Sequence, residues 1–268
     1  MKSPKWVKIA ALCMAAAAVM ATASCSLTGD SEEETTTERP AVLLEARPQS
    51  AGEILDFFNR AANAVKAERP GVSVDHSYSV KDVDTGEVPE AEALINFAKN
   101  FSEALDGTGE TREYGADLND LLPLKGTDTV SRLTDTDIAS AEITDIEDDP
   151  YTYEVHIVLK DGREFAQNAY DFDVDKSGVL TTFADYKDTL EVSDYEVSYA
   201  GCEIFARINK ETDRMQWLRY ERDAIVTADV SFTGTMASFG EVPVQFTLHD
   251  TLTAEGFVWE APSEEASE

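Results

Sequence analysis

The fold is decided by residues 226–249, which read VTADVSFTGTMASFGEVPVQFTLH. In this stretch apolar side chains alternate with polar ones, first at Val226, Ala228, Val230 and Phe232, then at Val242, Val244, Phe246 and Leu248. A period of two is that of a β-strand with one buried face and one solvated face. The stretch therefore predicts two neighbouring strands of an antiparallel sheet.

The same alternation recurs along most of the chain. It predicts strands at residues 72–80, 143–146, 151–159, 191–199, 202–208 and 215–221. The pair Asp161-Gly162 is typical of a tight hairpin turn, so a further strand is expected from Arg163 to Tyr170. Leu118, Leu121, Leu122 and Leu124, in a loop rich in Gly and Asp, are expected to point into the core.

Two helices are expected before most of these strands. Ser50 and Glu53 match the S-x-x-E capping box, and apolar residues at helical spacing continue from there to Arg69. Pro89 opens a second apolar-striped segment that continues to Leu105. Helices followed by many alternating strands predict the α+β class, with N-terminal helices packed on a large curved antiparallel sheet.

The N-terminus has the layout of an export signal. Three lysines, Lys2, Lys5 and Lys8, precede an apolar run from Ile9 to Met20, which is short for a membrane span. Two cleavage sites compete: Ala21-Thr22-Ala23 suits ordinary signal peptidase, whereas residues 22–25, Thr-Ala-Ser-Cys, resemble a bacterial lipobox. In the second case Cys25 would carry a diacylglyceryl anchor.

The segment behind Cys25 favours the lipoprotein interpretation. Residues 26–50 are rich in Ser, Thr and Glu, and such a segment buries too little apolar surface to fold. We therefore expect a signal peptide at 1–24, a lipid-anchored tether at 25–49, one α+β domain at 50–260 and a disordered acidic tail at 261–268. The protein would then lie on the extracytoplasmic face of the bacterial cell membrane.

Composition excludes several classes of protein. A nucleic-acid-binding protein needs a basic surface, and the formal net charge of −31 excludes that class. The 43 % of hydrophobic residues are enough to form a folded core, which excludes a wholly disordered protein. The chain has three cysteines; Cys13 leaves with the signal and Cys25 carries the lipid, so Cys202 has no partner for an intramolecular disulfide. Cys202 is expected to be buried as a small hydrophobe.

No motif for catalysis or metal binding stands out. The three histidines, His76, His156 and His249, lack local zinc-site spacing, and His76 is expected to be a hydrogen-bonded core residue. Asp171, Asp173 and Asp175 begin like a calcium loop, but Lys176 and Thr182 break the pattern. We therefore expect no enzyme activity, no cofactor and no metal; a hydrolase would need His156 or His249 beside clustered acids.

These features together resemble a known class of protein. Cys25, the Glu/Thr-rich tether, the helix 53–66, the segments 122–126 and 131–134, and the strand-turn-strand 201–220 resemble uncharacterised surface lipoproteins of Gram-positive, Firmicutes-type gut bacteria. The order of helices and sheet also resembles the LolA-like lipoprotein-carrier fold. That resemblance implies a half-barrel sheet that wraps helices and can enclose an acyl chain.

The sequence leads to two hypotheses of function. The first is a non-enzymatic binding module that holds a lipid or another apolar small molecule between its helices and its sheet. The alternative is a cell-surface protein that binds a protein or glycan through the exterior of the sheet. Trp217 and Tyr220, with Tyr195 and Tyr199 nearby in sequence, are the candidate ligand contacts, and ordinary sheet packing is the competing interpretation.

Overall fold

The computed structural model describes residues 46–84, 109–123, 126–127, 130–167 and 190–261. The predicted signal peptide, most of the tether including Cys25, and residues 262–268 of the tail therefore lie outside the described residues. So do the second predicted helix from Pro89, Leu124 and the acidic run 171–175. Within the described part, no helix is both long enough and apolar enough to cross a membrane.

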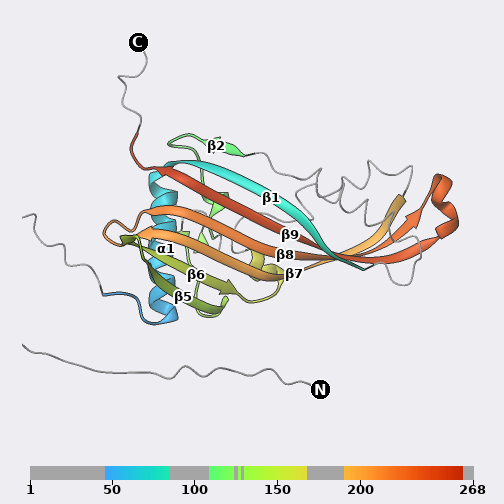
Figure 1. Cartoon of the computed structure of the whole chain (residues 1–268), viewed down its shortest axis with the longest axis horizontal. Helices are drawn as coiled ribbons and strands as arrows, with labels where there is room; N and C mark the ends of the chain where they lie inside the picture. Colours follow the sequence, from blue (N-terminus) through green and yellow to red (C-terminus); the bar gives the residue numbers. More distant parts are fainter. Residues whose placement is uncertain (1–45, 85–108, 124–125, 128–129, 168–189, 262–268) are drawn as a thin grey trace, which may run out of the picture. The chain divides into compact units, whose positions relative to one another are not determined.

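One large antiparallel sheet forms the described part (Figure 1). Its strand order is β2-β1-β9-β8-β7-β6-β5, and all neighbours pair antiparallel. The strands are β1 (Gly71–Asp84), β2 (Glu110–Arg112), β5 (Ile138–Ile146), β6 (Asp149–Leu159), β7 (Leu190–Asn209), β8 (Met215–Phe232) and β9 (Glu241–Val258). The predicted α+β class with a large antiparallel sheet is confirmed.

Short elements complete the described part. They are the 3-10 turns η1 (Asn119–Leu121) and η3 (Gly234–Phe239), the two-stranded ribbon of β3 (Gly126–Thr127) and β4 (Val130–Ser131), and the short helix α3 (Arg163–Gln167). η3 joins β8 to β9, and the two strands pair from Ser231 opposite Glu241 as far as Trp217 opposite Glu255.

The helix α1 (Ala51–Glu68) begins where the capping box predicts. The Ser50 hydroxyl accepts a hydrogen bond from the Glu53 backbone N–H at 3.3 Å, and the Glu53 carboxylate accepts one from the Ser50 N–H at 3.0 Å. These contacts satisfy amides that a helix start otherwise leaves unpaired. The helix ends at Glu68, and the next residue, Arg69, has a left-handed φ of 50° that turns the chain toward Pro70 and β1.

Helix α1 lies across the strands near one end of the sheet (Figure 1). We call the sheet face that carries α1 the inner face and the opposite one the outer face. Phe57 of α1 meets Tyr153 of β6 edge to face, with ring centroids 5.9 Å apart. The apolar residues that alternate with polar ones along each strand therefore lie together on the inner face of the sheet. The inner side chains near α1 are at most 4 % exposed: Val72, Val74, Val155, Ile157, Ile204, Ala206, Ile208, Leu218, Tyr220, Leu252 and Ala254.

The predicted strand from Arg163 to Tyr170 is wrong for residues 163–167, which form the helix α3, and its last part, 168–170, lies outside the described residues. Both hydrogen-bonding edges of β6 are already occupied, one by β5 and the other by β7. The chain after Gly162 therefore has no edge of β6 to pair with. Instead the Gly162 carbonyl accepts from the N–H groups of Phe165 and Ala166, which starts a helical turn.

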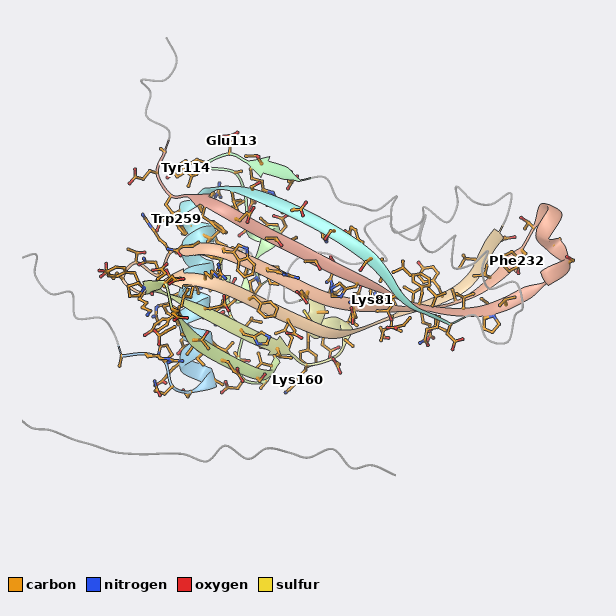
Figure 2. The ribbon with its side chains drawn as sticks, viewed as in Figure 1. Lys81, Glu113, Tyr114, Lys160, Phe232 and Trp259 are labelled. Atoms are coloured by element: carbon orange, nitrogen blue, oxygen red, sulfur yellow. The ribbon has the colours of Figure 1, made fainter. Side chains whose placement is uncertain are left out.

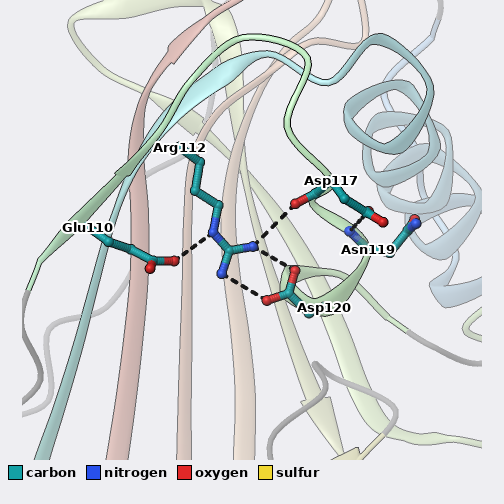
Figure 3. Close-up of polar contacts among 5 residues, drawn as sticks. All are labelled: Glu110, Arg112, Asp117, Asn119 and Asp120. Atoms are coloured by element: carbon teal, nitrogen blue, oxygen red, sulfur yellow. Dashed lines mark hydrogen bonds and ion pairs between the residues drawn. The ribbon is translucent and has the colours of Figure 1, made fainter.

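Arg112 holds the loop after β2 in place (Figure 3). Its guanidinium contacts both carboxylate oxygens of Asp120, at 2.6 and 2.8 Å, and its Nε contacts Glu110 at 2.6 Å. The Asp117 side chain accepts from the Asn119 N–H at 2.9 Å. With this loop fixed, three of the predicted core leucines are buried, namely Leu118, Leu121 and Leu122.

Candidate functional site

A buried ion pair lies in the middle of the inner face. Arg222 of β8 and Asp250 of β9 are register partners, and both are 0 % exposed. The Nε and Nη2 atoms of Arg222 both donate to Oδ2 of Asp250, at 3.0 and 2.7 Å. A buried charge is tolerated only when its partner lies this close and its remaining atoms are hydrogen-bonded.

The second oxygen of Asp250 continues the network to β1. His76 Nε2 lies 2.5 Å from Asp250 Oδ1, and the Tyr78 hydroxyl lies 3.1 Å from His76 Nδ1. Since an ionised carboxylate only accepts, Nε2 carries the proton that faces Asp250. The Tyr78 hydroxyl is the partner of the other ring nitrogen, Nδ1. The order of the network is thus Tyr78 to His76 to Asp250, with Arg222 on the far side of the carboxylate.

A bulge in β7 brings further groups to this network. Ala200 pairs with Asp223 and Glu203 with Glu221, so Gly201 and Cys202 together lie opposite Arg222. Burial raises the pKa of the Cys202 thiol to about 12, and the thiol therefore stays protonated at neutral pH. This confirms the prediction that Cys202 is a buried small side chain. The Arg222 guanidinium also lies 5.2 Å from the ring centroid of Tyr199.

The network is only partly shielded from solvent. Arg222 and Asp250 are completely buried, while the side chain of His76 is 21 % exposed and that of Tyr78 is half-buried. Burial, followed by the charge of Asp250, raises the pKa of Tyr78 well above its usual range, so this phenol stays protonated. The partly exposed members of the network are therefore the two on β1, His76 and Tyr78.

On the side of this network away from α1, the inner face is again apolar. We call residues 190–200, 224–232 and 241–249 of β7, β8 and β9 the distal half of the sheet; Figure 2 shows Phe232 at the end of this half and Trp259 near α1. Its inner side chains on β8 and β9 are at most 8 % exposed: Ala224, Val226, Ala228, Val230, Phe232, Val242, Val244, Phe246 and Leu248. A hollow of about 330 Å³ lies between β7 and β8 in this half, lined by Tyr195, Glu196, Thr227, Ala228 and Asp229.

The structure separates the two predicted ligand contacts. Tyr220 is 0 % exposed and faces inward, whereas Trp217 is half-buried on the outer face beneath the guanidinium of Arg207, 5.3 Å from its ring centroid. Tyr199 is buried on the inner face, and Tyr195, 46 % exposed, lies in the distal half. The four aromatic residues therefore do not form one binding platform.

The three histidines are likewise kept apart. His76 lies in the inner network, which confirms its expected role as a hydrogen-bonded core residue. On the outer face, His156 contacts Glu203 at 2.6 Å and His249 contacts Asp223 at 2.7 Å. Among the described residues, no group of three or more His, Cys, Asp or Glu side chains could hold a metal ion.

The sequence reasoning missed Arg222 and Asp250. Each carried a signal, since each is a charged residue at a position where the alternation demands an apolar one. Two residues before and after Arg222, on the same face of the strand, lie Tyr220 and Ala224. The corresponding neighbours of Asp250 are Leu248 and Leu252. Two opposite charges on inner faces of neighbouring strands indicate a buried pair.

Comparison with family models, with curated proteins and with solved structures found no match for this chain.

Proposed function

We propose that this protein is a membrane-anchored extracytoplasmic lipoprotein that binds a lipid or another apolar ligand without catalysing a reaction. The observation that supports it is the length of the apolar inner face. The 18 residues of β8 span roughly 60 Å at about 3.3 Å per residue. A helix that crosses the strands covers a band only about 10–12 Å wide. The apolar row therefore continues well past α1 into the distal half.

The inner side chains of β8 and β9 in the distal half are at most 8 % exposed, so in this proposal the ligand displaces the groups that cover them and then lies along the inner face. The hollow beside Tyr195 and Ala228 would be its point of entry, and the volume of the hollow, about 330 Å³, falls within the range of small-molecule sites. The curvature of a LolA-like half-barrel would wrap the ligand. The anchor at Cys25 would hold the binding domain close to the membrane, where apolar molecules are concentrated.

Native mass spectrometry of the mature chain tests the ligand. The chain from residue 25 to 268 with Cys25→Ser avoids confusion with its own acyl groups. We expect a non-covalent adduct that organic extraction releases as an apolar molecule. A bare mass, from protein whose circular dichroism shows a folded sheet, would contradict the proposal.

A matched pair of variants locates the site. Val230 faces inward in the distal half and its neighbour Ser231 faces outward, so the same bulky residue can be placed on either face. Val230→Phe should reduce adduct occupancy because it fills space on the inner face, whereas Ser231→Phe should leave it unchanged. Equal occupancy in both variants would place the ligand elsewhere.

A further inference from the structure

We propose that the tip of the β8–β9 hairpin, residues 234–240, contacts a lipid surface whose head groups are zwitterionic or uncharged. The tip lies at the opposite end of the sheet from α1 (Figure 1). One part of this inference rests on the proposed function, because the anchor at Cys25 would keep the tip close to the membrane. The inference does not require that the inner face binds a ligand.

The tip is uncharged in a chain that is otherwise strongly charged. Residues 230–240 contain no Asp, Glu, Lys or Arg, although 28 % of the chain is charged and its formal net charge is −31. No longer run without these four residue types occurs after Asp30. The turn η3 reads GTMASF, and so contains a Met and a Phe. Absence of charge is what a segment that enters lipid requires, since charged side chains are costly there.

The tip also projects beyond the neighbouring strands. The pairing of β1 with β9 stops at Gln245, and that of β7 with β8 stops at Phe232. Among the described residues, no third strand pairs with the hairpin past these positions. Gly234, Ala237 and Ser238 of the tip are exposed, as is residue 240. A flat surface can therefore reach the tip before it meets the rest of the sheet.

The backbone of the tip suits an environment that is poor in water. The Gly240 N–H donates to the Ala237 carbonyl at 3.3 Å, and the Phe232 N–H donates to the Gly240 carbonyl at 3.1 Å. Backbone groups without a partner are costly away from water. These internal hydrogen bonds therefore lower the cost of placing the turn among lipid head groups.

The size of the tip favours lipid over a protein partner. A stable protein interface takes roughly 20–30 residues from each side, far more than residues 234–240 supply. A lipid surface needs only a few apolar side chains at the boundary between head groups and acyl chains. The anchor would raise the effective concentration of the tip at the membrane, so that a weak contact is enough. Anionic head groups would repel a chain of net charge −31.

Flotation with lipid vesicles tests the inference on the mature Cys25→Ser chain, which carries no acyl group. We expect the chain to float with phosphatidylcholine vesicles, and to bind more weakly when half of the lipid is phosphatidylglycerol. Added salt should reduce this difference, because it screens the repulsion. Failure of the folded chain to float with phosphatidylcholine vesicles would overturn the inference. Tighter binding to the phosphatidylglycerol vesicles would overturn it as well.

Two substitutions of opposite kind locate the contact. Ala237→Asp adds a charge at the tip and should weaken binding to phosphatidylcholine vesicles about tenfold, whereas Ala237→Leu should strengthen it. The same two substitutions at Ala139, exposed on β5, are the matched control and should change nothing. Equal effects at the two positions would overturn the inference. If Ala237→Asp does not fold, the comparison of Ala237→Leu with Ala139→Leu decides.

Flotation and native mass spectrometry separate this inference from the proposed function. A chain that floats but carries no adduct would support the lipid contact and contradict ligand binding. A chain that carries an adduct but does not float would support ligand binding and overturn the lipid contact.

Discussion

Arg222 and Asp250 show how much a single buried residue depends on its partner. Replacing Arg222 by Met keeps most of the side-chain volume but leaves the Asp250 carboxylate buried without its counter-charge. Because an uncompensated buried charge is costly, Arg222→Met should lower the free energy of unfolding by about 3–5 kcal/mol. Urea unfolding followed by circular dichroism measures this change.

The control for that variant is an exposed ion pair. Arg47 and Asp145 lie 3.2 Å apart, but their side chains are 40 % and 56 % exposed. Arg47→Met should therefore cost no more than about 1 kcal/mol. Similar losses in the two variants would show that burial does not control the strength of the Arg222–Asp250 pair.

At the scale of secondary-structure elements, the capping box predicts how α1 responds to substitution. Ser50→Ala removes the acceptor for the Glu53 N–H, and should lower the free energy of unfolding by about 1 kcal/mol. Thermal or urea unfolding at pH 7 tests this value. An unchanged midpoint would mean that the start of α1 is fixed by packing alone.

The acidic partner in the same capping box predicts a pH dependence. Hydrogen bonds from the backbone N–H groups of Gln49 and then Ser50 lower the pKa of Glu53 below its ordinary value of 4.5. A carboxyl with a lowered folded-state pKa stabilises the fold while it is ionised, above about pH 4.5, and loses that contribution as the pH falls through the lowered pKa. The stability difference between the parent chain and Glu53→Gln should therefore shrink as the pH is lowered from 7 to 3. A difference that stays constant over this range would contradict the assignment.

The β7 bulge gives a prediction that depends on backbone conformation. Gly201 has a φ of 56°, which L-residues adopt only at a cost, so Gly201→Ala should lower the free energy of unfolding by about 1 kcal/mol. Gly52, in the first turn of α1, is the matched control. An added Cβ there meets nothing closer than the Asp135 carboxylate at 3.9 Å, and Gly52→Ala should be neutral or stabilising by up to about 1 kcal/mol. Equal signs for the two variants in urea unfolding would contradict this account.

The helices and strands that could be predicted from sequence are those that a local pattern of residues determines. The capping box located the start of α1, and period-two alternation located the strands. Neighbouring predicted strands proved to be continuous, because residues 191–199 and 202–208 both belong to β7, which passes through the bulge at Gly201. The helix α3 could not be predicted from Asp161-Gly162, since it forms where distant β7 occupies the edge of β6.

At the scale of the whole molecule, the anchor can be tested without knowing the ligand. Cys25→Ala removes the only sulfur that the lipobox interpretation provides for a diacylglyceryl group. The variant should move from the membrane fraction to the soluble fraction, and metabolic labelling with an alkyne fatty acid should no longer mark it. Stable retention requires buried acyl chains, each methylene contributing about 0.8 kcal/mol.

Cleavage at the competing site would give a result that contradicts the lipid anchor. Cleavage after Ala23 by ordinary signal peptidase would release the protein whether or not Cys25 is present. An unlabelled parent chain in the soluble fraction would therefore show simple secretion, and Cys202→Ala, a substitution at a buried thiol, serves as the control for loss of a cysteine.

By itself, the sequence determined the fold class, the start of α1, the division of each strand into an apolar and a polar side, and the burial of Cys202. These properties depend on residues close together in the chain, where spacing alone decides which side chains share a face. Only the tertiary structure decided that Trp217 lies beneath the guanidinium of Arg207 and that β1 pairs with β9. It also brought His76, Arg222 and Asp250 from three strands into one network. Such contacts join residues up to 174 positions apart, and they form because a buried charge is stable only beside its partner.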